Sequence, residues 1–242
     1  MDVEKASRFA DRAMRLLERV QYRRAESLAE KEAIYRLRHE AYRRAGTVEP
    51  KPSGMFHDPM DETDNAWLIG MYIDGVLASA LRLHISASLS VPLPELASFP
   101  DLVEPHLAAG RTIIDASRFV SRFEFSQQYS ETPYLTLRPI LLAEEFFAAD
   151  YAVAGCLAEH QAFYHRLFGA VTWSAPRPYP HFKRPMAMVA YDCKAERERI
   201  HKRYPFYKST HVERMRLFQR SSNVAGLVLE AIGRWDERAG AI

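Results

Sequence analysis

Opposite charges stand inside or beside apolar segments at several places in the sequence. The acids are Asp58, Asp61, Asp64 and Asp115, and the arginines are Arg82 and Arg118. Asp115 and Arg118 belong to the segment Asp-Ala-Ser-Arg within the apolar run 112–120, and Arg82 ends the apolar run 76–81. Because a charge inside a buried strand is costly unless it is paired, the pattern predicts a buried network of acids and arginines that shapes a site.

The composition is that of a globular protein with balanced charge. The 242 residues include 33 basic and 31 acidic side chains, for a net charge of +2, and 48% are hydrophobic. This balance argues against a general nucleic-acid-binding protein. The two cysteines, Cys156 and Cys193, form no Cys-x-x-Cys pair, and His160 and His165 are five residues apart, so we expect neither a disulfide framework nor a metal site. A reducing cytoplasm is the expected location.

No membrane-spanning or targeting segment is expected. The N-terminus is charged from Asp2 onward, and no run of about 18 apolar residues occurs. Residues 3–20 have helical apolar spacing with basic residues mostly off the apolar stripe. Acids dilute these basic residues, so a solvated face is the first interpretation, and peripheral membrane contact is the alternative.

The periodicity predicts a mixed α/β layer with one sheet. The first expected elements are a strand at 22–27, a helix at 29–45, a long loop at 46–65, a hairpin of 67–73 and 76–85 across Asp74-Gly75, and an irregular insertion at 86–111 with a short helix. They are followed by a strand at 112–124, a helix at 134–150, a strand at 151–156, a helix at 159–168, and strands at 171–174 and 186–191. From residue 194 onward we expect helices with a break at Pro205, and the last helix has Val224, Leu227, Val228, Ile232 and Trp235 on its apolar face. We expect an N-terminal helix at 1–20, a core domain at 21–192 and a helical extension at 193–242.

This order resembles the acyl-homoserine-lactone (autoinducer) synthases, a branch of the GNAT-fold acyltransferases. It resembles still more closely their relatives, the long-chain N-acyl amino acid synthases of the FeeM type. The resemblance covers roughly residues 20–192, and the matching residues are Arg38 and Tyr42 in the first core helix, Asp58 and Asp61 in the loop, Arg82 at a strand end, and Asp115-Ala116-Ser117-Arg118. It implies a GNAT-like α/β (α+β) fold with a mixed central sheet flanked by helices.

Two departures argue against lactone synthesis. Val48 stands near the position where the autoinducer synthases have a tryptophan, and Asp115 replaces their usual glutamate. The resemblance therefore implies an N-acyltransferase that moves a fatty acyl group to the amine of an amino acid. The alternatives are an autoinducer synthase or a non-catalytic lipid- or protein-binding module.

The acyl donor implied by the resemblance is an acyl carrier protein. Typical GNAT enzymes have Gln/Arg-x-x-Gly-x-Gly/Ala after the central strand, where a helix N-terminus binds the pyrophosphate of CoA. Residues 122–134 contain no glycine, and a turn without glycine does not admit phosphates to the backbone in that way. We expect no bound cofactor, with acyl-carrier protein as cosubstrate and acyl-CoA as the other option.

The implied chemistry is aminolysis of a thioester. Backbone N–H groups around residues 119–122 would stabilise the oxyanion. An α-amino group with a pKa near 8 is about one-tenth neutral at pH 7, so a base need supply only about 1–2 kcal/mol. Asp115 and Glu124 are the candidate bases. A structural ion pair is the alternative for Asp115, and a solvated strand end is the alternative for Glu124.

Strand geometry also limits which side chains of the segment Asp115-Ala116-Ser117-Arg118 can share a face. Because side chains alternate along a strand, Asp115 and Ser117 share a face, whereas Arg118 points to the other unless a bulge intervenes. Tyr164 resembles the GNAT tyrosine that protonates the leaving thiolate, with core packing as its alternative.

The remaining site residues follow from the resemblance and from charge. The catalytic candidates are Asp115, Glu124, Tyr164 and Arg118, and the substrate-binding candidates are Arg38, Tyr42, Asp58, Asp61, Arg82, Ser117, Phe119 and Val120. Because a carrier protein is acidic, its docking face should be basic, and the candidates are Arg122, Arg138, Lys183 and Arg184. For Asp58, Asp61 and Arg82, with Asp115 and Arg118, we prefer the role of a latch that seats the long loop beside the acceptor pocket.

Overall fold

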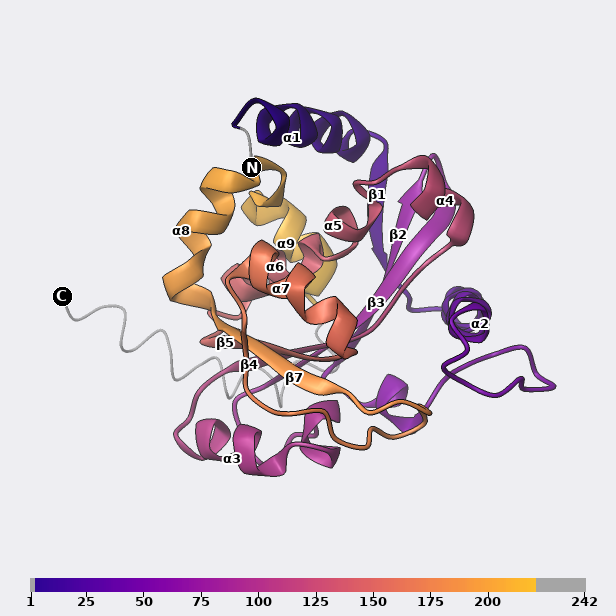
Figure 1. The fold of residues 1–242 in the computed structure, drawn as a ribbon, viewed down its shortest axis with the longest axis vertical. Coiled ribbons are helices and arrows are strands. Elements are labelled where there is room, and N and C mark those ends of the chain that lie inside the picture. The colour runs from indigo at the N-terminus through magenta and orange to yellow at the C-terminus, as the bar shows by residue number, and fades with distance from the viewer. Residues whose placement is uncertain (1–2, 221–242) are drawn as a thin grey trace.

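A computed structural model describes residues 3–220 of the chain (Figure 1). Within these residues, one sheet of seven strands has the order β1-β2-β3-β4-β5-β7-β6. The strands are β1 (Val20–Arg24), β2 (Ala66–Ile73), β3 (Val76–Ser86), β4 (Ile113–Ser121), β5 (Tyr151–Cys156), β6 (Val171–Thr172) and β7 (Ala187–Asp192). Neighbouring strands are antiparallel except for the parallel pair β4 and β5. The predicted mixed sheet is confirmed.

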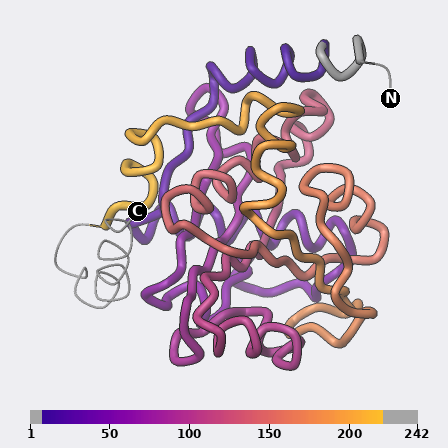
Figure 2. Tube along the Cα trace, turned by 90° about the vertical axis from the view of Figure 1, so that its left-hand side faces the viewer, coloured from indigo at the N-terminus to yellow at the C-terminus, as the bar shows by residue number. Residues whose placement is uncertain are grey.

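Helices cover both faces of the sheet. The α-helices are α1 (Val3–Leu17), α2 (Leu28–Arg44), α3 (Pro100–Ala108), α4 (Phe123–Gln128), α5 (Thr132–Thr136), α6 (Arg138–Phe146), α7 (Gln161–Phe168), α8 (Cys193–Arg203) and α9 (His211–Phe218), and the 3-10 helices are η1 (Pro59–Glu62), η2 (Pro94–Ala97), η3 (Ala158–His160) and η4 (Pro205–Tyr207). Figure 2 shows α1 at the end of the molecule opposite the magenta segment that contains α3. Among the described residues, no helix is long and apolar enough to cross a membrane.

Period-two alternation divides the core between the two faces. Trp67, Ile69 and Met71 of β2 pack into the larger core, together with side chains of α5, α6, α7, α8 and α9. Leu68 points the opposite way, toward α2. The larger core also includes Ala13 of α1, so the N-terminal helix and the segment after β7 are packed against the same sheet face.

The central strands separate at the middle of the sheet. The parallel ladder between β4 and β5 ends at the pair Asp115 and Val153, while β4 continues to Ser121. A bulge lies in β4 opposite the segment 80–82 of β3. Arg118 within it has a φ of 56°, a left-handed conformation that is uncommon for a residue other than glycine. The fork between β4 and β5 and the bulge together create the setting of the candidate site.

Several predicted boundaries were wrong. The strand expected at 112–124 ends at Ser121, because Arg122 caps the short helix α4. The helix expected at 134–150 is divided into α5 and α6, since Pro139 lacks an N–H and favours a helix start. The predicted last helix, with Val224, Leu227, Val228, Ile232 and Trp235, lies outside the described residues.

Candidate active site

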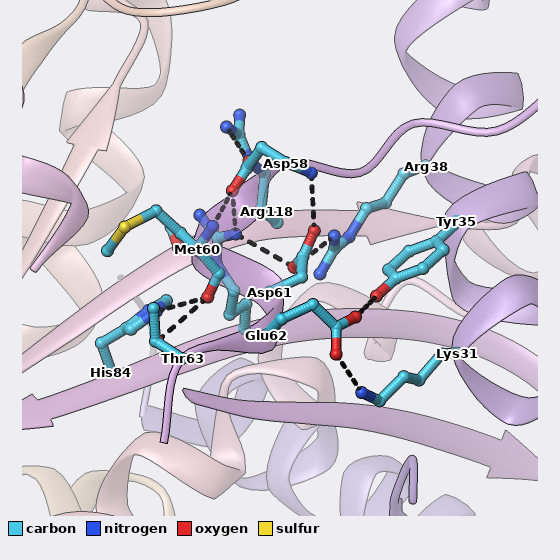
Figure 3. Close-up of polar contacts among 12 residues, drawn as sticks. Lys31, Tyr35, Arg38, Asp58, Met60, Asp61, Glu62, Thr63, His84 and Arg118 are labelled. Atoms are coloured by element: carbon cyan, nitrogen blue, oxygen red, sulfur yellow. Dashed lines mark hydrogen bonds and ion pairs between the residues drawn. The ribbon is translucent and has the colours of Figure 1, made fainter. Parts of the chain in front are cut away.

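Three arginines and two aspartates form a buried cluster between α2, η1, β3 and β4 (Figure 3). We call Arg38, Asp58, Asp61, Arg82 and Arg118 the arginine–aspartate cluster. Arg82 Nη1 donates to Asp58 Oδ1 at 2.7 Å and to Asp61 Oδ1 at 3.0 Å. Arg38 Nη1 lies 2.8 Å from Asp61 Oδ1, and Arg118 Nη2 lies 2.6 Å from Asp58 Oδ2. The cluster joins residues from four elements that are far apart in sequence.

The sequence of the long loop explains why its two aspartates are held in place. Asp58 Oδ1 accepts from the Met60 N–H at 3.0 Å, and Asp61 Oδ2 accepts from the Asp58 N–H at 3.0 Å. This reciprocal arrangement is a capping box at the start of η1, with Pro59 at the first helical position. All four carboxylate oxygens of the cluster therefore accept hydrogen bonds, from arginines or from backbone.

The cluster remains ionised over a wide pH range. Burial alone would raise the pKa of Asp58, but the guanidiniums of Arg82 and Arg118 outweigh it and lower that pKa below its ordinary value. The pKa of Asp61 is also lowered, because Arg38 and Arg82 outweigh its burial. Burial, and next Arg82, lower the pKa of His84 to about 3.

This cluster changes the predicted roles of several residues. Arg38 and Arg82 are buried and contact the aspartates, and neither they nor the aspartates line the cavity described below. These four residues therefore lie outside the cavity wall, and the latch stays a prediction for the cluster. Asp64 is exposed and takes no part, and Asp115 is not bonded to any arginine of the cluster. Arg38 replaces Asp115 as the fifth member.

A cavity of about 570 Å³ opens where β4 and β5 separate. Its walls come from α2, from β4 beyond Asp115, from the end of β5, from α7 and from the segment 179–186. The predicted residues that line it are Tyr42, Ser117, Arg118, Phe119, Val120 and Tyr164. Most of the remaining wall is apolar or aromatic, so the cavity suits an elongated apolar ligand with a polar end.

Arg118 connects the cluster to the cavity. Its side chain pairs with Asp58, and its guanidinium carbon lies 5.1 Å from the ring centre of Phe56 and 4.9 Å from that of Phe182. Because Arg118 lies in the bulge of β4, its side chain does not follow the regular alternation of side chains along a strand. Tyr42 packs edge-to-face against the same two phenylalanine rings, at 5.0 and 5.1 Å between centres.

Asp115 is bonded to Glu95 of η2, a residue outside the predicted site. The Glu95 N–H donates to Asp115 Oδ2 at 2.8 Å. The carboxyl group of Glu95 accepts from the Gly155 N–H at 2.7 Å and from the Tyr179 hydroxyl at 3.0 Å. Both acids are fully buried. The sequence signal that could have revealed Glu95 is a single acid between Leu93-Pro94 and Leu96 in the irregular insertion.

The electrostatics of these two acids are opposite to those of the cluster. Burial and the charge of Asp115 raise the pKa of Glu95 to about 8. Burial raises the pKa of Asp115 to about 7 against the lowering effects of the Glu95 N–H, Arg82 and Arg118. Both pKa values lie near neutrality, where a carboxyl group can exchange protons.

Other candidates fall away from the cavity. Glu124 is exposed in the first turn of α4 and does not line the cavity, and the strand whose end was its alternative stops at Ser121. Arg138 is buried, because η4 and α9 fold over the start of α6, and it bonds the carbonyls of Phe206 and Lys208 and the carboxylate of Glu213. The structure thus places Glu124 at the surface outside the cavity wall, and Arg138 in the interior away from the cavity.

Three of the predicted docking residues are next to, or paired beside, residues that line the cavity. Lys183 follows the lining residue Phe182 and pairs with Glu49 at 2.6 Å. Arg184 pairs with Glu159 at 2.6 Å. Arg122 lines a shallow groove of about 200 Å³ that shares Ala41, Ala45 and Ser121 with the cavity.

Within residues 3–220, no group of three or more His, Cys, Asp or Glu side chains is arranged to hold a metal ion. The two cysteines in this part are buried and free.

The fold agrees with those of solved acyltransferase structures. FeeM, an N-acyl amino acid synthase from uncultured soil microbes, superimposes with a TM-score of 0.64 at 16% identity, covering 78% of this chain and 98% of that one. The acyl-homoserine-lactone synthase LasI gives a TM-score of 0.52 at 16% identity, covering 71% and 88%. The structure of TofI superimposes with a TM-score of 0.54 at 14% identity, covering 77% of this chain and 96% of that one. These likenesses define a GNAT-like acyltransferase fold.

The sequence itself identifies the branch of that fold. Residues 33–192 match the family model of the N-acyl amino acid synthase FeeM. The chain belongs to the FeeM N-acyl amino acid synthase family and is an acyltransferase of that family. No curated protein sequence matches it.

Proposed function

We propose that this protein transfers a fatty acyl group from the thioester of an acyl carrier protein to the amine of an amino acid. The observation that carries the proposal is the apolar cavity of about 570 Å³ in the fork between β4 and β5. Its volume lies in the range of ligand pockets. Family membership supplies the reaction class, and the polar residues at the fork supply the groups that aminolysis needs.

The reaction assigns a distinct role to each group at the fork. The amine attacks the thioester carbonyl carbon, and the C–S bond breaks as the amide forms. Asp115 precedes Ala116 and Ser117, which line the cavity, and we assign it as the base that takes the amine proton through one water molecule. Tyr164 of the opposite wall protonates the leaving thiolate.

The developing negative charge on oxygen is stabilised by the backbone of β4. Beyond Asp115 this strand has no β5 residue beside it, so alternate N–H groups on that edge face the fork. Arg118 is committed to Asp58 and serves to hold the bulge and the cavity wall. The long side chains around it exclude water from the acyl group.

The proposed donor is a carrier protein because the region after β4 does not suit the pyrophosphate of CoA. Residues 122–134 contain no glycine, and α4, which begins there, is only six residues long. The adjoining groove is lined by Arg44 and Arg122. Two arginines suit the single phosphate of a pantetheine arm.

The test is an assay of the purified protein with one acyl chain on two carriers. Acyl-carrier protein and acyl-CoA of the same chain length are each incubated with a mixture of amino acids, and mass spectrometry detects N-acyl products. We expect an N-acyl amino acid with the higher kcat/KM for acyl-carrier protein. A higher kcat/KM for acyl-CoA would overturn the donor assignment, and no N-acyl amino acid from either donor would overturn the function. A parallel reaction with S-adenosylmethionine should give no lactone.

A further inference from the structure

Glu95 and Asp115 meet at the point where β4 and β5 begin to separate. Asp115 is the last β4 residue paired with β5, and Glu95 contacts Gly155 two residues after the end of that ladder. A Cβ atom added at Gly155 would lie 2.9 Å from Glu95 Oε1 and 3.3 Å from Oε2. Because Gly155 and Tyr179 line the cavity, the carboxyl group of Glu95 lies directly behind its wall.

Each acid of this pair has one oxygen without a hydrogen-bond partner. Among the described residues, no donor reaches Glu95 Oε2 or Asp115 Oδ1, although both atoms are buried. A buried acceptor without a donor is destabilising, and buried acceptors are normally bonded. A proton on one of these oxygens would turn that acceptor into a donor, because a carboxylic acid carries an O–H group.

The surrounding groups do not neutralise both acids. The charged or titratable groups on neighbouring elements are Arg82 and His84 of β3, Arg118 of β4, Cys156 of β5 and Tyr179. Arg82 and Arg118 form their ion pairs with Asp58 and Asp61. His84, opposite Asp115 on β3, is neutral because its pKa is lowered to about 3. Two like charges in one buried site cannot both form without cost.

We propose that Glu95 and Asp115 hold one proton between them at neutral pH and act as a single base, with Glu95 as a positioning residue that stores the proton beside Asp115. The inference rests on the proposed function for its reaction. The backbone N–H of Glu95 orients Asp115, and the Gly155 N–H and Tyr179 hydroxyl orient Glu95.

The proton balance of the step is complete. As the amine nitrogen bonds to the thioester carbon and the C–S bond breaks, the amine proton passes to Asp115, and the pair goes from one proton to two. The thiolate takes a proton from Tyr164 and becomes the free thiol of the carrier. The extra proton of the pair then returns through solvent to Tyr164. No oxidant, reductant or further co-reactant is needed.

The molecule contains a matched control at Glu144 of α6. It is also fully buried, it accepts a hydrogen bond from Tyr191, and one of its oxygens has no partner in the described residues. Burial raises its pKa to about 8. It does not line the cavity, and the neighbouring acid Glu145 is only partly buried and is paired with Arg214, so Glu144 should titrate in one step.

The test is carboxyl ¹³C NMR titration of the wild type and of the Glu95→Gln, Asp115→Asn and Glu144→Gln variants. In the wild type, the carboxyl carbons of Glu95 and Asp115 should each show two steps between about pH 6 and 9, as coupled sites do. Glu95→Gln should leave one step at Asp115. Asp115→Asn should move the Glu95 titration to lower pH, because the neighbouring charge is gone, and Glu144→Gln should change neither residue.

Activity at several pH values separates a positioning role from a structural one. The ratio of wild-type to Glu95→Gln kcat/KM, measured with one amino acid, cancels the titration of the amine. It should grow by about 3- to 10-fold between pH 7 and 9, because only the wild type gains a second carboxylate. The corresponding ratio for Glu144→Gln should stay constant.

The outcomes distinguish the inference from the proposed function. Independent single steps for Glu95 and Asp115, each unmoved by substitution of the other, would overturn the pair even if product forms. A constant activity ratio across pH would reduce Glu95 to a structural residue. Coupled steps in a wild type that makes no N-acyl amino acid would overturn the proposed function and leave the shared proton in place.

Discussion

Two groups of buried acids lie beside or within strands β3 and β4, and their surroundings differ. In the arginine–aspartate cluster, all four carboxylate oxygens accept hydrogen bonds, and three guanidiniums contact two acids. In the pair of Glu95 and Asp115, each acid has an oxygen without a partner in the described residues, and the nearest arginines are bonded elsewhere. The pKa values are lowered in the first group and raised in the second.

The difference shows that partners, rather than burial, decide what a buried carboxyl group does. Burial is the largest influence on the pKa of Asp58 and of Asp115 alike, and it acts in the same direction on both. Guanidiniums at 2.6–2.7 Å reverse its effect at Asp58. A carboxylate so paired holds segments together, whereas one left near neutrality can take up a proton.

The largest effect is expected when a guanidinium is removed from the cluster. Arg82→Met should lower the free energy of unfolding by about 3–5 kcal/mol, because Asp58 and Asp61 would lose their shared counter-ion while remaining buried. Denaturant unfolding measures this. Arg36→Met, which removes an exposed pair with Glu32, is the control and should cost about 0.5 kcal/mol or less. A loss below 1 kcal/mol at Arg82 would mean that the cluster does not stabilise the fold.

The pH dependence of stability should separate the two groups by sign. Glu95 and Asp115 have raised pKa values of about 8 and 7, so between about pH 4.5 and 7 the folded state binds protons that the unfolded state has lost. Stability should therefore fall as the pH rises through this window. Glu95→Gln should reduce that slope by about 1 kcal/mol per pH unit.

The aspartates of the cluster act in a different window. Their lowered pKa values contribute stability that is present above the unfolded pKa of about 4 and is lost as the pH falls below it. Urea unfolding from pH 3 to 8 would show both effects. If Glu95→Gln leaves the slope between pH 5 and 7 unchanged, then Glu95 titrates with an ordinary pKa in the folded protein.

A smaller effect, on catalysis, is expected at Asp115. Asp115→Asn should lower kcat/KM by about 10- to 100-fold, because the base supplies about 1–2 kcal/mol or slightly more. Its stability at pH 7 should be retained, since the amide oxygen can still accept from the Glu95 N–H. Steady-state assays with acyl-carrier protein measure the loss, and Glu144→Gln should retain activity. Full activity of Asp115→Asn would remove Asp115 from proton transfer.

The cluster was largely predictable from sequence because its members interrupt apolar runs. Arg82 and Arg118 lie in strands, and two acids three residues apart lie in a segment rich in prolines. Such charges must find each other when the strands are buried. The sequence predicted the direction of the Arg118 side chain only for a strand with or without a bulge. The bulge itself depends on the register in which β3 and β4 pair across a long insertion.

Glu95 could not be predicted in the same way. It lies in an insertion without helical or strand periodicity, and its contacts with Asp115, Gly155 and Tyr179 depend on three-dimensional packing. Arg138 shows the opposite error. Its charge suggested a surface position, but the later segment of η4 and α9 covers it and supplies its partners. Tertiary contacts between distant segments decided both cases.

The smallest effect is expected for a cation that belongs to neither group. Arg184 is about half exposed, and its pair with Glu159 lies in solvent next to lining residues of the cavity. Arg184→Ala should change the free energy of unfolding by less than about 0.5 kcal/mol. It should raise the KM for acyl-carrier protein by about 2- to 3-fold at low salt, because rim charges act mainly on encounter with an acidic partner. A small acyl thioester without the carrier protein should show no change in KM. An equal rise for both donors would place Arg184 in acyl binding, and no rise for either would remove it from the docking surface.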